Sequence, residues 1–192
     1  MQEKKNAERK PAGRERLLQT ARQLFIRRGA SNVGINEVTE EAGVARMTLY
    51  NNFPSKEALT VAVYEDMTAA ALRALEETAK SAGTEKARID AIFGLFGKRA
   101  GSGEYRGCPF IHASLQEAAP SGPVHAVVQR YKRALRQQVF EALEEGRAKR
   151  AELADQIVLL LDGAVTEAYI GGVADPMTVA RRAAEALLAS DG

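Results

Sequence analysis

The chain has 192 residues, of which 45% are apolar and 27% are charged, enough for a packed core and incompatible with wholesale disorder. Its single Cys excludes an internal disulfide framework, and its two His show no zinc-ligand spacing, so we expect neither a metal nor a cofactor. No run approaches the roughly 18 uncharged apolar residues of a membrane span, and no signal peptide is visible. We therefore expect a cytoplasmic protein that has no membrane partner.

Apolar residues recur with a helical period along most of the chain, and no strand-like alternation is visible. Aromatic residues make up only 6% and Trp is absent, so the core is expected to consist of Ala, Leu and Val, which favour helices. The pattern predicts an all-α fold of about nine helices. They are expected at about 14–28, 35–42, 46–52, 56–80, 85–99, 108–118, some 25 residues from 124, 152–170 and 176–189.

Positive charge is concentrated at the start of the chain. Residues 1–56 hold eleven Lys/Arg against six Asp/Glu, whereas residues 57–192 hold sixteen against nineteen. This asymmetry indicates an end that faces a polyanion, the alternative being a solvated charged surface. The segment 1–12 is polar and without apolar period, which predicts a flexible basic arm. Such an arm lies along phosphates or in the minor groove, or simply stays in solvent.

Two short predicted helices, 35–42 and 46–52, follow a longer one within this basic quarter. The sequence Ala42-Gly43-Val44 between them supplies a small residue where helices cross and a glycine for the turn. The outer face of the second helix is mostly polar. This combination is typical of a helix-turn-helix, whose second helix enters the major groove of DNA.

Residues 35–44 and 48–59 resemble the helix-turn-helix of the TetR family of bacterial transcriptional repressors. The order Ala-Gly-Val, a short gap, Thr-Leu-Tyr, two residues, Phe, then Ser-Lys-Glu carries the resemblance, which covers residues 13–67. Residues 106–110, with Pro123 and Val124, are similar to the regulatory domains of one TetR subgroup. The resemblance implies a DNA-binding domain at 13–56, with its motif from Gly34 to Phe53. It further implies a ligand-binding and dimerisation domain at 57–192.

The resemblance also implies roles for side chains of the motif. Tyr50 and Lys56 would bind phosphates, with packing against the first helix as the alternative for Tyr50. Arginine prefers guanine edges and asparagine adenine edges, and methionine suits a thymine methyl group. The residues expected to contact DNA are Asn36, Ala45, Arg46, Met47, Thr48, Tyr50, Asn51 and Lys56.

Three positions depart from the family pattern. Ala45 stands where the family usually has Ser, which removes a helix-capping or phosphate-binding hydroxyl. Gly34 replaces a Thr or Ser cap, although glycine is itself an acceptable cap, and Asn52 replaces an aromatic residue or His. These departures bear on the DNA sequence recognised and leave the expected fold unchanged.

The segment 152–170 is apolar nearly all round, so one of its faces is expected to meet something besides its own core. A homodimer through this helix and the last one satisfies that need, the alternative being a fully buried helix in a monomer. Two-fold symmetry would place the recognition helices one DNA turn, about 34–36 Å, apart. The expected interface residues are Ile157, Leu161, Ala164, Val165, Ala168, Val179, Ala183 and Leu187.

An effector pocket is expected between the predicted helices 85–99, 108–118 and the one from 124, which line the pocket in this family. A few polar groups in an apolar cavity suit a small ligand. The candidate residues are Phe93, Phe96, Cys108, Phe110, Ile111, His112, Gln116 and Tyr131, with simple core packing as the alternative for the Phe and Ile residues and a satisfied or exposed side chain for His112.

These expectations together describe a sequence-specific DNA-binding regulator, a repressor released from a palindromic operator by a small molecule of unknown identity. One alternative is a regulator that responds to oxidation of Cys108, and another is a constitutive DNA-binding protein without a ligand. An all-helical enzyme is a third alternative, for which the sequence offers no nucleophile–base pair, metal cluster or phosphate loop.

Overall fold

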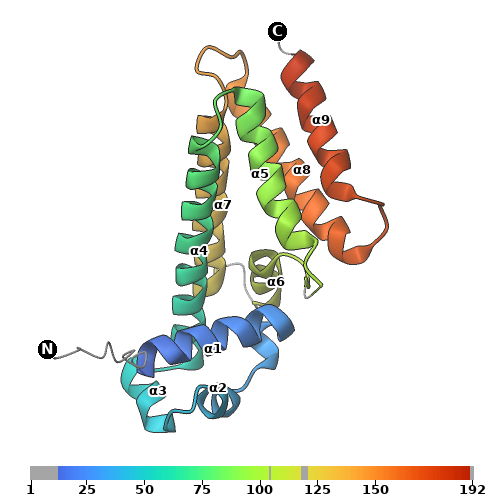
Figure 1. Ribbon diagram of the computed structural model, residues 1–192. Helices are drawn as coiled ribbons and strands as arrows, with labels where there is room; N and C mark the ends of the chain where they lie inside the picture. Colours follow the sequence, from blue (N-terminus) through green and yellow to red (C-terminus); the bar gives the residue numbers. More distant parts are fainter. Residues whose placement is uncertain (1–12, 104, 118–120, 191–192) are drawn as a thin grey trace, which may run out of the picture. The chain divides into compact units, whose positions relative to one another are not determined.

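The computed structural model describes residues 13–103, 105–117 and 121–190; the predicted basic arm, 1–12, lies outside these ranges. Within them the chain forms nine α-helices, one 3-10 helix and no strand, which confirms the predicted all-α fold (Figure 1). The elements are α1 (Gly13–Arg28), η1 (Ala30–Asn32), α2 (Ile35–Glu41), α3 (Arg46–Asn52), α4 (Lys56–Lys80), α5 (Glu85–Ala100), α6 (Pro109–Gln116), α7 (Pro123–Ala142), α8 (Arg150–Ile170) and α9 (Pro176–Ser190).

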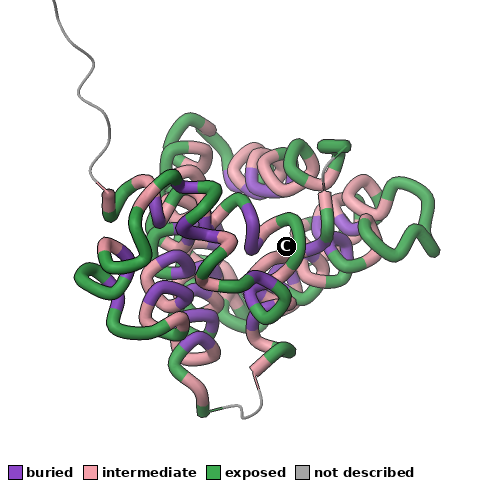
Figure 2. The backbone as a smooth tube through the Cα atoms, turned by 90° about the horizontal axis from the view of Figure 1, so that it is seen from below, coloured by how far each residue is buried: buried purple, intermediate pink, exposed green. Residues whose placement is uncertain are grey.

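The chain divides into two compact units, residues 1–63 and 64–192, and α4 passes from the first into the second. The first unit holds α1, α2 and α3 around a small apolar core. Leu17, Leu24 and Phe25 of α1 are buried there with Val38 of α2 and Leu49 of α3. Buried stretches alternate with exposed ones along these helices, as Figure 2 shows, because each helix turns one apolar stripe inward.

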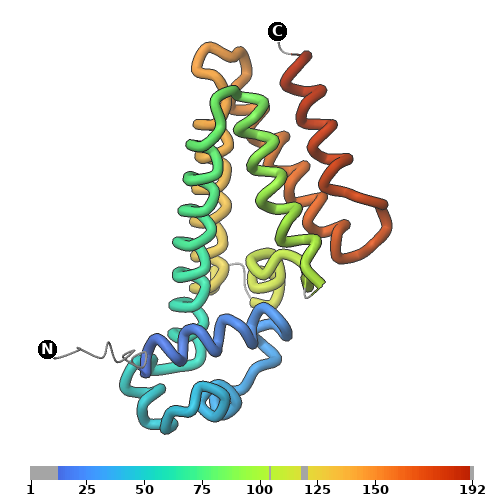
Figure 3. The backbone as a smooth tube through the Cα atoms, in the orientation of Figure 1, coloured from blue at the N-terminus to red at the C-terminus, as the bar shows by residue number. Residues whose placement is uncertain are grey.

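The second unit is built from the rest of α4 and from α5 to α9. In it α4 and α7 lie side by side, and the amide of Gln138 donates a 3.1 Å hydrogen bond to the carbonyl of Leu72 (Figure 3). The helix α5 packs against α7, α8 and α9, and α8 pairs with α9. The buried side chains of Ile89, Leu135 and Ile157 show that α5, α7 and α8 share one apolar core.

Local sequence signals account for most helix boundaries. Gly29 ends α1 with a positive φ of 79°, a conformation that glycine adopts without a steric penalty. The Ser55 hydroxyl accepts the Ala58 N–H at 3.0 Å at the start of α4, and Asp175 accepts the Thr178 N–H at 3.3 Å at the start of α9.

The predicted helix from 124 ends earlier than expected, at Ala142, after 20 residues. Leu143 turns to extended backbone, and arginine side chains take the freed carbonyls: Arg88 Nε bonds that of Ala142 at 2.7 Å, and Arg150 Nε bonds that of Phe140 at 3.0 Å. The 3-10 helix η1 was not predicted, because a single turn carries no periodic signal. None of the helices in the described ranges is long and apolar enough to cross a membrane.

Candidate functional site

The turn between α2 and α3 is held by an arginine from α1. Gly43 has a φ of 61°, in the left-handed region. The Arg16 guanidinium donates to the carbonyl oxygens of Gly43, at 2.8 Å, and of Ala42. These carbonyls belong to the end of α2, where helix geometry leaves them without partners. Arg16 therefore fixes the angle at which α3 leaves the turn, a role that the apolar pattern of α1 did not indicate.

The first turn of α3 has no side-chain cap. Ala45 occupies the N-cap position with extended backbone and offers no hydroxyl, so its carbonyl alone receives the Thr48 N–H, at 2.8 Å. Amide groups at this helix start remain available to an external acceptor such as a phosphate oxygen.

One face of α3 is open to solvent and carries most of the predicted base-contacting residues. Arg46, Met47, Tyr50 and Asn51 are exposed, and Met47 retains 68% of its surface. The guanidinium of Arg46 lies over the Tyr50 ring, 5.6 Å from its centroid. Thr48 is only half-buried and faces α1: a Cβ built on Gly13 would lie 2.9 Å from its methyl carbon. Four of the five predicted residues of α3 thus share an exposed surface.

The other predicted contacts stand at helix starts nearby in the first unit. Asn36 is exposed in the first turn of α2. Lys56, the first residue of α4, is half-buried and donates to the carbonyl of Ser31 at 3.3 Å. That bond uses one of three ammonium protons, so two remain for a phosphate.

Part of the positive charge of the first unit is used inside it. Arg28 pairs with Glu37, and Arg27 pairs with Glu41 at 3.2 Å, so both tie α1 to α2. The excess of basic residues at the start of the chain is therefore partly structural, which a count of charges could not reveal.

In the second unit the predicted pocket residues divide between core and surface. Phe110 is buried, stacked on Tyr131 with ring centroids 3.9 Å apart and tilted against Tyr64 at 6.0 Å. Phe93 is also buried, whereas Gln116 is exposed. The remaining candidates are half-buried: Phe96, Cys108, Ile111 and His112.

Cys108 lies at the N-cap of α6, and its charge in the thiolate form would raise the pKa of three tyrosines, Tyr64, Tyr105 and Tyr131. Burial raises the pKa of the Cys108 thiol and outweighs the hydrogen bonds from the α6 backbone amides, which lower it; the smaller effects of the Asp162 carboxylate and the Lys132 ammonium oppose each other. The resting side chain is therefore a protonated thiol.

Two of these tyrosines form no hydrogen bond through the hydroxyl within the described part of the chain. Tyr64 and Tyr131 are nearly fully buried, and neither hydroxyl makes a hydrogen bond to a described residue, whereas the Tyr105 hydroxyl donates to the carbonyl of Val165 at 2.8 Å. Buried tyrosine hydroxyls usually find a partner. Burial raises the pKa of Tyr64 to about 12, so this group is a hydrogen-bond donor at neutral pH.

A hydroxyl–imidazole pair that the sequence did not reveal joins α6 to α7. The Ser114 hydroxyl lies 2.5 Å from Nδ1 of His125, and Nε2 of His125 lies 3.0 Å from the amide nitrogen of Gln129. An amide, not a carboxylate, thus occupies the place of the third member of a catalytic triad. Glu117 accepts the backbone N–H of His125 at 2.9 Å and strengthens the same junction.

The predicted dimer residues of α8 fall mostly on its inner face. Ile157, Leu161, Ala164 and Val165 are buried in the core of their own chain, so they have no surface to offer a partner. Other apolar residues form the outer face of α8. The sequence pattern could not distinguish them from the buried residues, because α8 is apolar on nearly all sides. An open apolar groove of about 710 Å³ between α8 and α9 is lined by Gln156, Leu159, Leu160, Ala183, Ala186, Leu187 and Ser190. Two of the predicted residues, Ala183 and Leu187, line it, and Val179 is exposed on α9.

Comparison with known proteins places this helix-turn-helix in a family. The sequence signature of bacterial regulatory proteins of the tetR family matches residues 17–63. An uncharacterized HTH-type transcriptional regulator of Mycobacterium tuberculosis is 40% identical over 57 residues, 30% of this chain and 28% of that protein. The HTH-type transcriptional repressor NemR of Escherichia coli is 31% identical over 136 residues, which cover 70% of this chain and 68% of NemR.

The likeness extends to the whole fold. The structure of SCO4454, a TetR-family transcriptional regulator from Streptomyces coelicolor, superposes with a TM-score of 0.84 at 27% identity, covering 93% of this chain and 95% of that one. The reduced form of E. coli NemR gives a TM-score of 0.82 at 27% identity, covering 90% and 94%. The exposed recognition helix, the sequence match and the shared fold agree: the chain belongs to the TetR family of DNA-binding transcriptional regulators.

Proposed function

We propose that the protein is a dimeric repressor that binds a palindromic operator through α3 and is released by a small molecule bound in its second unit. The exposed face of α3, formed by Arg46, Met47, Tyr50 and Asn51, is the observation that carries this proposal. The 31% identity to the repressor NemR supports the sign of regulation.

The polar and apolar groups of that face suit distinct parts of DNA. The Arg46 guanidinium matches the paired acceptors of guanine, the Asn51 amide matches adenine, and Met47 offers an apolar surface to a thymine methyl. Tyr50, Lys56 and the uncapped amides of the first turn of α3, after Ala45, would bind phosphate oxygens. In this proposal the side chains of α3 determine which DNA sequence is recognised, and the phosphate contacts at the helix starts fix the position of the protein along the DNA.

The proposed DNA recognition can be tested by selecting bound sequences from a random pool of duplexes at two salt concentrations. The expected product is a palindrome with half-sites one turn apart. Arg46→Ala should lose preference at one base pair of each half-site, with a loss of about 1–3 kcal/mol on the best sequence. Arg73→Ala removes another exposed arginine, on α4 in the second unit, and should change nothing. Binding that is salt-sensitive but without sequence preference would refute the proposed recognition.

The groove between α8 and α9 is the surface proposed for the second copy of the chain. Leu159 on its wall retains 70% of its surface, and exposed apolar patches of this kind mark interfaces. Leu159→Glu should yield monomers in sedimentation experiments. Leu115→Glu, on α6, alters a leucine that retains 78% of its surface and should leave the dimer intact. A dimer that survives Leu159→Glu would contradict this assignment.

Release requires only a modest energetic coupling between the two units. A 100-fold loss of operator affinity corresponds to about 2.7 kcal/mol, within the usual range for allostery. By linkage the operator must weaken ligand binding by the same factor. Titration of labelled operator with protein, at rising ligand concentrations, measures this factor directly.

Oxidation of Cys108 is a second candidate signal. The NemR structure that resembles this chain is of a reduced form, and the Lys132 ammonium lowers the pKa of the Cys108 thiol, against the larger raising effects of burial and of Asp162. Operator affinity measured before and after hydrogen peroxide treatment, in the wild type and in Cys108→Ser, separates this signal from a bound ligand. An equal response of both proteins would exclude the thiol.

A further inference from the structure

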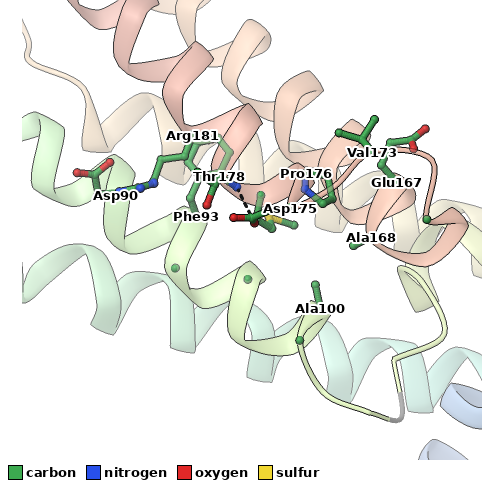
Figure 4. Close-up of a pocket in the computed structure, with 15 residues that line it drawn as sticks. Asp90, Phe93, Ala100, Glu167, Ala168, Val173, Asp175, Pro176, Thr178 and Arg181 are labelled. Atoms are coloured by element: carbon green, nitrogen blue, oxygen red, sulfur yellow. Dashed lines mark hydrogen bonds between the residues drawn. The ribbon is translucent and has the colours of Figure 1, made fainter.

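A cleft in the second unit, distinct from the predicted pocket, lies where α5 passes the end of α8 and the start of α9. It has a volume of about 630 Å³, within the range of small-molecule sites. Figure 4 shows Phe93 and Ala100 on the α5 side, with Ala168 of α8, Val173 of the loop after α8 and Pro176 at the start of α9 on the other side. Of the eight residues predicted to line an effector pocket, only Phe93 contributes to this cleft.

Missing side chains create much of the space. Gly94, Gly97 and Gly101 follow one another along the face of α5 that lines the cleft, and Gly171 ends α8 opposite them. A Cβ built on Gly94 or Gly171 would meet nothing within 4 Å, and one on Gly97 would only touch Met177, at 3.8 Å. Glycine costs stability within a helix, so two of them inside α5 at an open cleft indicate that the space itself is used.

The cleft is lined by more negatively charged than positively charged side chains. The lining holds three carboxylates, of Asp90, Glu167 and Asp175, and one guanidinium, of Arg181. The guanidinium is already paired, with Glu185 at 3.8 Å, and Asp90 is paired with Lys86 at 2.6 Å. Among the described residues, neither Glu167 nor Asp175 forms an ion pair. Hydrogen bonds from the side chain and the N–H of Thr178 lower the pKa of the Asp175 carboxyl, and the positive charges of Arg181 and Arg182 lower it further, so it is ionised.

At the end of the cleft formed by Asp90 of α5, one carboxylate oxygen has no hydrogen-bond donor among the described residues. Oδ1 of Asp90 is buried and accepts no hydrogen bond from a described residue, although Oδ2 is bonded by Lys86. An apolar wall with the carboxylates of Glu167 and Asp175 at one end and the unbonded Oδ1 of Asp90 at the other is complementary to a molecule that carries donors and positive charge on an apolar body.

We propose that this cleft binds an organic cation, a protonated amine joined to an apolar group, with Glu167 and Asp175 facing the ammonium and Phe93 with the glycine face of α5 receiving the apolar part. The proposal rests on the proposed function, because it names the class of molecule that releases the operator. It places that molecule outside the aromatic cluster of Phe110 and Tyr131.

Isothermal titration calorimetry on the full chain, without DNA, tests the site directly. The probes are phenylalkylamines with two to six methylene groups, each with the alcohol and the carboxylic acid of the same length. At least one amine is expected to bind once per chain, with about tenfold higher affinity than its alcohol, because charge-assisted hydrogen bonds are the stronger ones. The acid is expected not to bind.

Two sets of variants locate the site. Glu167→Gln with Asp175→Asn removes two charges and keeps shape, since asparagine also caps helices and tolerates the positive φ of 48° at position 175. It should cut amine affinity at least tenfold and leave the alcohol unchanged. Glu152→Gln with Asp155→Asn removes two charges of α8 outside the cleft and should have no effect. Gly94→Leu should abolish binding by filling the cleft, whereas Gly94→Ala should retain it.

Each outcome decides the proposal. Amine-selective binding that the cleft variants abolish and the controls retain supports it. Failure of every amine to bind, equal binding of amine, alcohol and acid, or binding that survives Gly94→Leu overturns it; circular dichroism confirms that each variant is folded. Operator selection is done without any probe, so loss of this site and loss of the proposed DNA recognition are observed independently.

Discussion

Glu85, the first residue of α5, holds Arg147 in the loop between α7 and α8 through two hydrogen bonds, Nε to Oε1 at 2.9 Å and Nη2 to Oε2 at 2.6 Å. Both side chains are almost fully buried, and Oε1 also accepts the backbone N–H of Glu144 at 2.9 Å. A carboxylate at a helix start meets the positive end of the helix dipole as well. One side chain thus joins α5 to the connection between two other helices of the second unit.

Removal of this carboxylate should destabilise the second unit. Glu85→Ala removes the carboxylate that the buried Arg147 guanidinium bonds twice, and loss of one partner of a buried ion pair costs about 3 kcal/mol. Urea unfolding, followed by circular dichroism, measures the loss. Glu152→Ala in the first turn of α8, where the side chain is exposed, is the matched control and should cost little. A midpoint unchanged by Glu85→Ala would contradict the role assigned to the pair.

The same pair predicts a pH dependence. Burial alone would raise the pKa of Glu85, but the hydrogen bonds from Arg147 and Glu144 prevail and lower it below the ordinary value of 4.5. A lowered folded-state pKa means that the stabilisation is complete above the unfolded-state value and is lost as pH falls below it. Stability should therefore fall below about pH 4.5 in the wild type, and Glu85→Gln should lessen that slope. Parallel acid titrations of the two proteins give the comparison.

The turn of the helix-turn-helix depends on the absence of a side chain at position 43. Gly43→Ala should destabilise the first unit by about 1–2 kcal/mol, because L residues are strained at a positive φ. The new Cβ would also lie 2.7 Å from Nη2 of Arg16, so the clamp on the turn is disturbed. Gly43→Asn should cost less, since asparagine tolerates this conformation. Equal thermal stability of the Ala and Asn variants would argue against backbone strain as the cause.

Sequence periodicity was sufficient to predict where the helices lie in the chain, but not which side of each helix is buried. The apolar segment 152–170 predicted α8 within two residues at its start, yet a helix that is apolar nearly all round does not reveal which side meets its own core. Ile157 and Leu159 are both apolar, yet Ile157 is buried and Leu159 is exposed. The packing of α5 and α9 against α8 determines which of them is covered.

The candidate sites were likewise predictable only where the sequence pattern of one helix indicates them, and not where they depend on tertiary packing. The face of α3 was predictable because a short amphipathic helix has one side to offer, and Leu49 takes the other. Arg16 was not, because its partners are carbonyls 26 and 27 residues away. The α5 cleft was missed because glycine contributes to a site by what it omits, and Gly94 and Gly97 carry no chemical signal of their own.

The missing cap at α3 predicts that one substitution will stabilise the protein. Ala45 has the extended backbone of an N-cap residue, φ −67° and ψ 145°, without an acceptor in its side chain. Ala45→Ser should add about 1 kcal/mol by accepting an N–H of the first turn. Ala45→Val, which adds bulk without an acceptor, should not. Thermal denaturation of the three proteins distinguishes the cases, and operator affinity shows whether the hydroxyl also reaches a phosphate.

The state of Cys108 predicts slow alkylation at neutral pH. Thiolate is the reactive species, and burial raises the pKa of this thiol above its ordinary value of 9.0, so at pH 7.5 the folded protein should react with iodoacetamide more slowly than the chain unfolded in urea. The rate for the folded protein should keep rising above pH 9, where that of the unfolded chain levels off. Lys132→Met should slow the reaction further, because the nearby ammonium favours the thiolate. Since Cys108 is the only cysteine, mass spectrometry of the intact chain follows the reaction without ambiguity. A folded-state rate above the unfolded-state rate at pH 7.5 would mean that the thiol is activated, and oxidation would then outrank a bound ligand as the releasing signal.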